Sequence, residues 1–129
     1  MEVKMIDVSV HNGVIDWDKV KASGIGGVLM RCGYGSDIES QDDKMFKRNA
    51  DECSRLGIPF GVYLYSYAKN TDMARSEADH ALRLVKGYKL SYPLYIDVEE
   101  ASQSGIAKDV VKVFCEAVKA AGYMPGVYA

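Results

Sequence analysis

Two carboxylates one residue apart close an apolar run in the segment Tyr95-Ile-Asp-Val-Glu99. Because successive side chains of a β-strand point to opposite faces, Asp97 and Glu99 are predicted to share one face, with Cβ atoms roughly 6–7 Å apart. Like charges at this range raise the pKa of at least one carboxyl group, which places a proton donor beside an ionised partner. Cleavage of an acetal between two sugars needs this pairing. The motif therefore favours glycoside hydrolysis.

A third acid, Asp7, has the equivalent position in the first predicted strand, residues 4–10. In a barrel of parallel strands the active site forms at the carboxyl ends of the strands, where all three acids would meet. A single acid at such a place is more often a solvated surface group, but three at matched strand ends favour a site. A divalent metal is an alternative use of the same acids. The nitrogen donors His11 and His80 are too few to favour zinc, whereas magnesium stays open on composition alone.

Aromatic residues accompany the acids on the predicted inward faces of the strands. Tyr63, Tyr65 and Tyr67 alternate along the third strand, and Tyr34 ends the second. Rings with hydroxyl groups stack on sugar faces and hydrogen-bond to their edges, although tyrosines can also simply fill a barrel. The sugar-binding interpretation is stronger for Tyr65 and Tyr34, which lie nearer the mouth. Arg31 also alternates onto the inward face with Leu29 and Gly33, so it must pair with a site acid or contact substrate.

The elements that position these residues alternate along the chain. Strands are predicted at 4–10, 26–34, 59–67, 93–99 and 125–129, and helices at 17–23, 43–56, 72–86 and 106–121. Asp16 and Thr71 are predicted N-caps, and a glycine follows each helix. Single helices between strands indicate right-handed crossovers and a parallel sheet.

The faces of the predicted strands decide between two parallel architectures. On the third and fourth strands an aliphatic face, such as Val62 with Leu64, lies opposite a polar and aromatic face. An open doubly wound sheet is buried on both faces, whereas a barrel keeps polar groups inside its mouth. The expected fold class is therefore α/β, an incomplete TIM-like (β/α) barrel with about five parallel strands and four helices. Residues 1–129 are expected to form a single domain that lacks its last strands, and the unpaired sheet edge predicts self-association.

Composition excludes several other classes. A length of 129 residues suits one domain, and the net charge of −2 comes without the basic runs that track nucleic acid. We expect no membrane insertion, because the apolar runs are only strand-sized, and no signal peptide is recognisable at the start of the chain. Cys32, Cys53 and Cys115 have no metal-binding spacing and are predicted to be buried free thiols. Trp17, directly after a helix cap, is expected to anchor the core.

At this point the sequence resembles a known family, the glycoside hydrolase family 25 muramidases, or Chalaropsis-type lysozymes, which include many phage endolysins. The similarity runs through the family's blocks in order: 7–17, 31–35 with Phe46 and Asn49, 61–66, Glu77-Ala78, 95–99 and 125–128. It covers nearly the whole chain, as a C-terminally truncated member.

The resemblance implies hydrolysis of the β-1,4 bond from N-acetylmuramic acid to N-acetylglucosamine in peptidoglycan, by a protein made in the cytoplasm that acts on the bacterial cell wall. Glu99 would be the general acid, with Asp97 assisting and Asp7 tuning the pair. The expected substrate-binding residues are Tyr63, Tyr65, Tyr34, Arg31 and Asn12. No metal or organic cofactor is expected, and the expected partners are glycan strands rather than nucleic acid. The alternative is a fragment that binds peptidoglycan with little or no catalysis.

Overall fold

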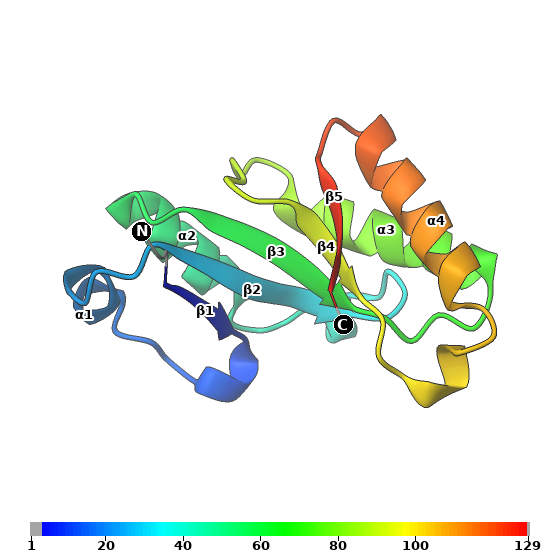
Figure 1. Cartoon of the computed structure of the whole chain (residues 1–129). Coiled ribbons are helices and arrows are strands. Elements are labelled where there is room, and N and C mark those ends of the chain that lie inside the picture. The colour runs from blue at the N-terminus through cyan, green and yellow to red at the C-terminus, as the bar shows by residue number, and fades with distance from the viewer. Residues whose placement is uncertain (1–3, 129) are drawn as a thin grey trace.

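A five-stranded parallel sheet in the order β1-β2-β3-β4-β5 forms the centre of the computed structural model, which describes residues 4–128 (Figure 1). The strands are β1 (Met5–Val8), β2 (Gly27–Tyr34), β3 (Phe60–Tyr65), β4 (Leu94–Asp97) and β5 (Pro125–Tyr128). The helices are α1 (Trp17–Ala22), α2 (Phe46–Leu56), α3 (Thr71–Val85) and α4 (Ala107–Ala120). Every strand pair is parallel. The prediction of a parallel, unclosed α/β sheet with five strands and four helices is confirmed for the described residues.

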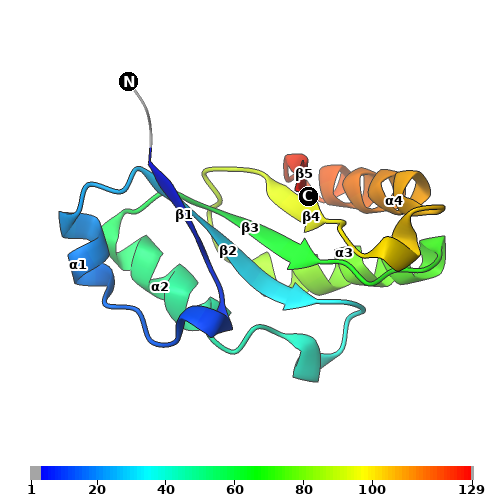
Figure 2. The same cartoon turned by 60° about the horizontal axis from the view of Figure 1, so that its bottom comes forward.

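The helices cover one face of the sheet and leave the other open. The helices α2, α3 and α4 contact β2, β3, β4 and β5; Figure 1 shows α2 and α3 behind the sheet and α4 to the right of β5, and Figure 2 shows α1 beside α2. The covered face consists of fully buried apolar side chains, namely Val28, Met30, Val62, Leu64, Leu94 and Ile96. Burial of each such side chain stabilises the fold by about 1.5–3 kcal/mol. The aliphatic alternation in the sequence therefore marks the outward face of a barrel wall.

Several element boundaries differ from the predicted ones. β1 ends at Val8 because the next residues form a 3-10 helix, Val10–Asn12, that is closed by a reciprocal cap between Ser9 and Asn12. The N-cap of α3 is Asn70 instead of Thr71, because the Asn70 side chain accepts the hydrogen bond from the Met73 backbone at 2.8 Å. Ala129, expected to end the fifth strand, lies outside the described residues.

A β-bulge in β2 changes the predicted alternation of its side chains. The pairing with β3 shifts between Arg31 and Gly33, so that Gly33 pairs with Leu64 and Tyr34 pairs with Tyr65. A Cβ atom at Gly33 would lie 3.0 Å from the His80 ring on α3. Gly33 therefore faces the helices, contrary to the predicted inward position, and the bulge returns Tyr34 to the open face.

The predicted core anchor is confirmed. Trp17 is 1% exposed, and its indole nitrogen donates to Asn49 at 3.1 Å. The three cysteines are free thiols; Cys32 and Cys53 are buried, whereas Cys115 is only partly buried, because it lies beside the buried stripe of α4 that Val110, Phe114 and Val118 form. Among the described residues, no helix has the length and apolar character that a membrane crossing requires.

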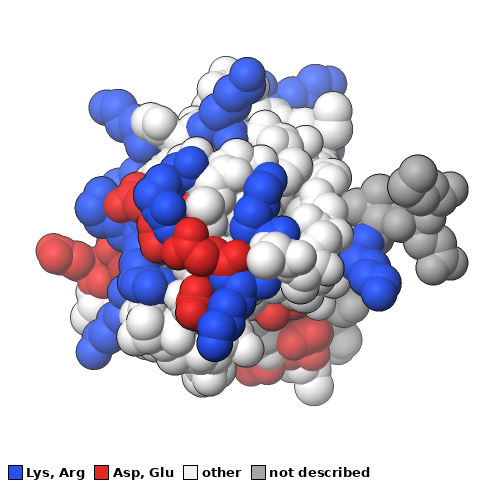
Figure 3. All heavy atoms as spheres, turned by 90° about the vertical axis from the view of Figure 1, so that its left-hand side faces the viewer, with Lys and Arg blue, Asp and Glu red and all other residues white. Residues whose placement is uncertain are grey.

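Charged residues of both signs share the end of the molecule where α1 and α2 lie. Figure 3 shows this end, with Lys and Arg side chains spread over it and Asp and Glu side chains among them. Arg55 of α2, for example, pairs with Asp18 of α1 at 3.2 Å and with Glu52 at 2.7 Å. Such exposed pairs contribute at most about 1 kcal/mol each.

Candidate active site

The three predicted catalytic acids lie around the open face of the sheet. Asp97 is the last residue of β4 and is 3% exposed, while Glu99 follows the strand and is exposed. Asp7 is exposed in β1, at the edge of the sheet. The pKa of Asp97 responds to the charges of both other acids. The structure therefore brings the three carboxylates into one electrostatic cluster.

Asp97, the buried member of this cluster, has a raised pKa. Burial, followed by the negative charge of Glu99 and then that of Asp7, raises the pKa of Asp97 from 3.8 to about 7. Its Oδ1 atom is buried and has no hydrogen-bond partner among the described residues. Neutral pH thus lies within the range in which this carboxyl group exchanges a proton.

Two stacked tyrosines contact the third acid. The Tyr128 hydroxyl on β5 donates to Asp7 Oδ2 at 2.9 Å, and its ring stacks on Tyr63 with centroids 5.4 Å apart and planes 6° apart. Burial and, secondarily, the neighbouring Asp7 raise the pKa of Tyr63, which is 8% exposed. Tyr63 therefore belongs to the interior beside the acids. Sequence reasoning did not single out Tyr128, although the period-2 pattern of the last strand could have indicated it.

Tyr65 lies nearer the mouth and contacts an acid that was not predicted. Its hydroxyl donates to Glu100 at 2.8 Å, and its strand position pairs with Asp97. The hydrogen bond to Glu100 is the main cause that raises the pKa of Tyr65, ahead of burial. The sequence does show a second glutamate directly after Glu99. Because Glu100 lies beyond the end of the strand, the period-2 alternation could not predict which face its side chain is on.

Arg31 lies on the open face and pairs with an acid, although not with a predicted site acid. Its partner is Asp43, at 3.0 Å, and not one of the three catalytic acids. Asp43 also accepts backbone hydrogen bonds from Val10 and Met45, both at 2.9 Å. Because these contacts hold Asp43 in the loop, α2 begins at Phe46 and not at residue 43 as predicted. Asp43 thus joins the ends of β1 and β2.

The remaining predicted binding residues take different positions. Tyr34 lies on the open face, with Arg31 stacked over its ring at 5.7 Å and Tyr67 edge-on at 6.1 Å. Tyr67 follows β3 rather than ending it, because the strand stops at Tyr65. Asn12 lies in the 3-10 helix after β1, where its side-chain oxygen accepts from the Ser9 backbone at 2.9 Å. That oxygen is therefore already engaged in a local cap.

A buried polar network connects the loops that follow β3 and β4. Glu77 on α3 is fully buried; it accepts from the Ser66 hydroxyl at 2.6 Å and from the Tyr67 backbone at 2.8 Å. Gln103, also fully buried, donates to Ser66 at 2.8 Å and to the Ala68 carbonyl at 3.1 Å. The network thereby fixes the loop after β4, which carries Glu99, against the loop after β3.

Two pockets lie at opposite ends of the sheet. A pocket of about 370 Å³ at the carboxyl end includes Arg31, Tyr34 and Tyr67. Another of about 350 Å³, around Tyr92 and Tyr123, lies at the amino ends of β4 and β5, far from the acids. Within residues 4–128, no group of three or more His, Cys, Asp and Glu side chains is arranged to hold a metal ion. The expected absence of a cofactor stays a prediction.

Known proteins share this sequence and fold. The model of the glycosyl hydrolases family 25 matches residues 6–129. The modular autolysin LytC from Streptococcus pneumoniae is 37% identical, with a TM-score of 0.85, over 98% of this chain and 32% of that one. LytC in complex with a synthetic peptidoglycan ligand is 36% identical, with the same TM-score and coverage.

A second relative is a phage protein. The catalytic domain of the endolysin ply40 from bacteriophage P40 of Listeria monocytogenes is 25% identical, with a TM-score of 0.87, over 100% of this chain and 64% of that one. No curated protein sequence matches the chain. This chain thus spans about a third of LytC and less than two thirds of ply40. Since the family model covers almost every residue, the chain belongs to the glycosyl hydrolases family 25.

Proposed function

We propose that the chain is a lysozyme-type muramidase, whose residues 1–129 belong to one catalytic domain. The reaction is hydrolysis of the β-1,4 bond between N-acetylmuramic acid and N-acetylglucosamine in bacterial peptidoglycan. The observation that carries this proposal is the cluster of Asp97, Glu99 and Asp7, in which Asp97 titrates near neutrality. Family membership and the peptidoglycan ligand bound by LytC support the substrate. The site of action is then the bacterial cell wall.

Glu99 and Asp97 share the chemistry as an acid pair. Glycoside hydrolysis needs one protonated carboxyl group at the leaving oxygen and a second carboxylate near the developing cation. Glu99 is exposed on the open face, so it is the member that a glycosidic oxygen reaches and the proposed general acid. Asp97 is buried beside it and assists by sharing its proton with Glu99, which leaves Asp97 as the second carboxylate. Asp7 adds negative charge to the pair, which favours retention of one proton by the cluster.

The substrate-binding roles of Tyr63, Tyr65, Tyr34, Arg31 and Asn12 belong to the same proposal. Tyr65 and Tyr34 have the best support, because both lie on the open face and pair with each other in the sheet. For Tyr63 and Arg31 the contacts to Tyr128 and Asp43 support a role in shaping the site. Asn12 has the weakest support, since its oxygen caps a local turn.

A Glu99→Gln variant tests the assignment. Release of reducing ends from purified glycan strands should fall by about 10²–10⁴-fold, the contribution of a general acid. Glu116→Gln, at an exposed position of α4, is the matched control and should keep the parental rate. Circular dichroism should show both variants folded. If Glu99→Gln kept the parental rate, the assignment of the general acid would be wrong.

Binding of peptidoglycan without turnover is the second candidate function. The observation that favours it is the unclosed sheet, in which β1 and β5 form two edges and the acids lie on an open face. Cosedimentation with insoluble peptidoglycan, measured beside turbidity loss, separates the two functions. Binding with no lysis and no new reducing ends would favour the binder.

The open edges of β1 and β5 also support self-association as a proposal. Met5 is 41% exposed and Val127 is 54% exposed, so apolar side chains accompany unpaired backbone groups at both edges. Sedimentation velocity over a range of concentrations should show a second, larger species. A single monomeric boundary at every concentration would contradict this proposal.

A further inference from the structure

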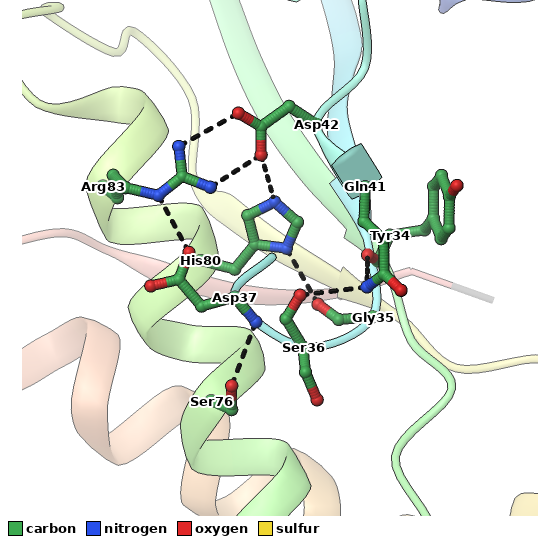
Figure 4. Close-up of polar contacts among 9 residues, drawn as sticks. All are labelled: Tyr34, Gly35, Ser36, Asp37, Gln41, Asp42, Ser76, His80 and Arg83. Carbon is green, nitrogen blue, oxygen red and sulfur yellow. Dashed lines mark hydrogen bonds and ion pairs between the residues drawn. The ribbon is translucent and has the colours of Figure 1, made fainter. Parts of the chain in front are cut away.

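A histidine that the chemistry described above does not use is buried between α3 and the loop after β2. The His80 side chain is fully buried, and each of its ring nitrogens meets an acceptor. Nδ1 lies 2.9 Å from the Gly35 carbonyl oxygen, and Nε2 lies 2.7 Å from Asp42 Oδ1 (Figure 4). Gly35 directly follows β2, and Asp42 returns to this strand through a bridge to Gly33. One side chain therefore holds both ends of residues 35–42.

The geometry of these two contacts calls for a proton on each ring nitrogen. A carbonyl oxygen only accepts hydrogen bonds, so Nδ1 donates to Gly35. A neutral imidazole has a single N–H group, which would leave the lone pair of Nε2 facing the Asp42 carboxylate. Partial burial would raise the pKa of Asp42, but the hydrogen bonds from Arg83 and His80 outweigh burial and lower it, so Asp42 is ionised. The contacts therefore fit an imidazolium that donates from both nitrogens.

The charges beside the ring match an imidazolium. Arg83, three residues further along α3, donates to Asp42 at 2.7 and 3.0 Å and to Asp37 at 2.8 Å. One guanidinium charge is thus shared by two carboxylates, and a protonated His80 supplies the second positive charge. Burial raises the pKa of Glu77 on the same helix, and the charge of His80 opposes this rise. The cluster is balanced only when the His80 ring is charged.

Within residues 4–128, the other elements around the ring present neutral or paired groups to it. Gly33 of β2 lies against the ring, and burial raises the pKa of the neighbouring Cys32 thiol, which is therefore uncharged. Asp43, the next acid along the loop, is paired with Arg31 at 3.0 Å. The buried side chains of β3 and α4, which also pack on α3, are apolar, namely Val62, Leu64, Val110, Phe114 and Val118. Asp42 is therefore the charge that the ring meets directly.

A stripe of three side chains on α3 clamps the loop. Ser76, His80 and Arg83 are separated by four and three residues, so they lie on one face of the helix. Ser76 accepts from the Asp37 backbone amide at 3.0 Å, and Figure 4 shows all three side chains turned towards the loop. Serine and arginine keep their charge state near neutral pH, whereas an imidazole does not. His80 is thus the member of the stripe that pH can switch.

The clamped loop also fixes a side chain of the proposed substrate-binding face. Tyr34 directly precedes Gly35, and its carbonyl oxygen accepts from the Gln41 side chain at 2.9 Å. The same Gln41 nitrogen donates to the Ser36 carbonyl at 3.0 Å, so the loop is tied to its own first residues. A loop that leaves α3 therefore takes the support of Tyr34 with it.

We propose that His80 is a positioning residue, whose doubly protonated ring locks residues 35–42 onto α3 and so holds Tyr34 on the open face. Loss of one proton turns the lone pair of Nε2 towards the Asp42 carboxylate, which breaks this bond and releases the loop. The lock is therefore present while the ring keeps both protons, and it is lost as the pH rises. The part that concerns glycan binding rests on the proposed function, whereas the lock itself does not.

Nitrogen-15 NMR of the ring, together with hydrogen exchange of the Asp37 amide, tests the lock in the parent protein from about pH 5 upwards. At acidic pH both ring nitrogens should carry protons and the Asp37 amide should be protected. Loss of a ring proton should lower the protection factor about tenfold, the effect of one charge-assisted hydrogen bond. One bare ring nitrogen at every pH, or constant protection while the ring loses its proton, would overturn the lock.

Two histidine variants separate the lock from other pH effects. His80→Gln cannot reach both acceptors with one amide nitrogen, so the protection factor of Asp37 should be low at every pH. His11→Gln, the matched control, removes the other histidine of the chain and should leave the pH dependence in place. Equal pH dependence in His80→Gln and His11→Gln would contradict the assignment to His80. The titration of the parent protein decides the lock even if His80→Gln does not fold.

Binding of a peptide-free glycan tetrasaccharide tests the positioning role in a Glu99→Gln background, where no turnover occurs. At acidic pH His80→Gln should raise the Kd about tenfold, because Tyr34 loses its support. Asp97 also titrates in this range, but it does so with and without His80, so the difference between the two proteins isolates the lock. An equal Kd in both proteins would overturn the positioning role. If the parent protein releases no reducing ends while the loop responds as described, the proposed hydrolysis fails and the lock stands.

Discussion

The Tyr128 hydroxyl donates a hydrogen bond to Asp7 Oδ2 at 2.9 Å, although 121 positions separate the two residues. Tyr128 ends β5 and Asp7 lies in β1, the two opposite edges of the sheet. Side chains from opposite edges can meet only if the sheet curls strongly around its open face. The bond therefore shows that five strands already have the curvature of a barrel wall and gather the acids within it.

Removal of this hydroxyl tests how much the cross-sheet contact stabilises the protein. Tyr128→Phe keeps the stack on Tyr63 but leaves Asp7 without this donor, so the free energy of unfolding should fall by about 1 kcal/mol. Urea denaturation measures the change. Tyr123→Phe is the control, since within the described chain its hydroxyl makes no side-chain hydrogen bond, and it should be nearly neutral. An equal loss in both variants would contradict a specific role for the bond.

The raised pKa of Asp97 predicts a pH dependence of stability. The folded protein keeps the Asp97 proton up to about pH 7, whereas the usual pKa is 3.8. The stabilising contribution is therefore complete below pH 3.8 and is lost as the pH rises to 7, by at most about 1.4 kcal/mol per pH unit. Asp97→Asn removes this titration. The stability of the wild type relative to Asp97→Asn should fall over this interval; a constant difference would contradict the shift.

The buried carboxylate of Glu77 is predicted to be a major determinant of stability. Glu77→Ala leaves the Ser66 hydroxyl and the Tyr67 amide without their acceptor and opens a cavity, so it should cost about 3 kcal/mol of unfolding free energy. Glu77→Gln keeps the volume and should cost less. The exposed Glu116→Gln should change stability by less than about 0.5 kcal/mol. Chemical denaturation of all three gives the ranking, and equal values for Glu77→Gln and Glu116→Gln would be inconsistent with the network.

Gly33 is predicted to be required because there is no room for a side chain at this position, and not because of its backbone freedom. A Cβ atom there would lie 2.7 Å from the Gln41 carbonyl and 3.0 Å from the His80 ring. Gly33→Ala should therefore destabilise the protein by about 1–3 kcal/mol through overpacking. Gly105→Ala is the matched control, because nothing lies within 4 Å of its added Cβ atom. Thermal melts should separate the two, and equal melting temperatures would refute the close contact.

The sequence predicted the strands and the faces of their side chains because both depend on local periodicity. Aliphatic residues such as Val62 and Ile96 alternate with Tyr63 and Asp97, and a period of two assigns their faces directly. The family resemblance, which the family model confirms over residues 6–129, came from spaced motifs of this kind.

Contacts between distant segments were not predictable in the same way. The bulge that turns Gly33 towards α3 is an irregularity in the pairing of β2 with β3, and periodicity carries no signal for it. Asp43 could not be identified as the partner of Arg31, because the pairing depends on how the loop folds back. The Glu77 carboxylate was noticed only as part of a motif, and its role follows from burial against Ser66.

Titration of the Asp97 carboxyl group by carbon-13 NMR tests the acid cluster most directly. The parent protein should show an apparent pKa of about 7, and this pKa should be lower in both Glu99→Gln and Asp7→Asn, because each variant removes a negative charge that holds the proton in place. An Asp97 that titrated near 3.8 in all three proteins would contradict the shared site.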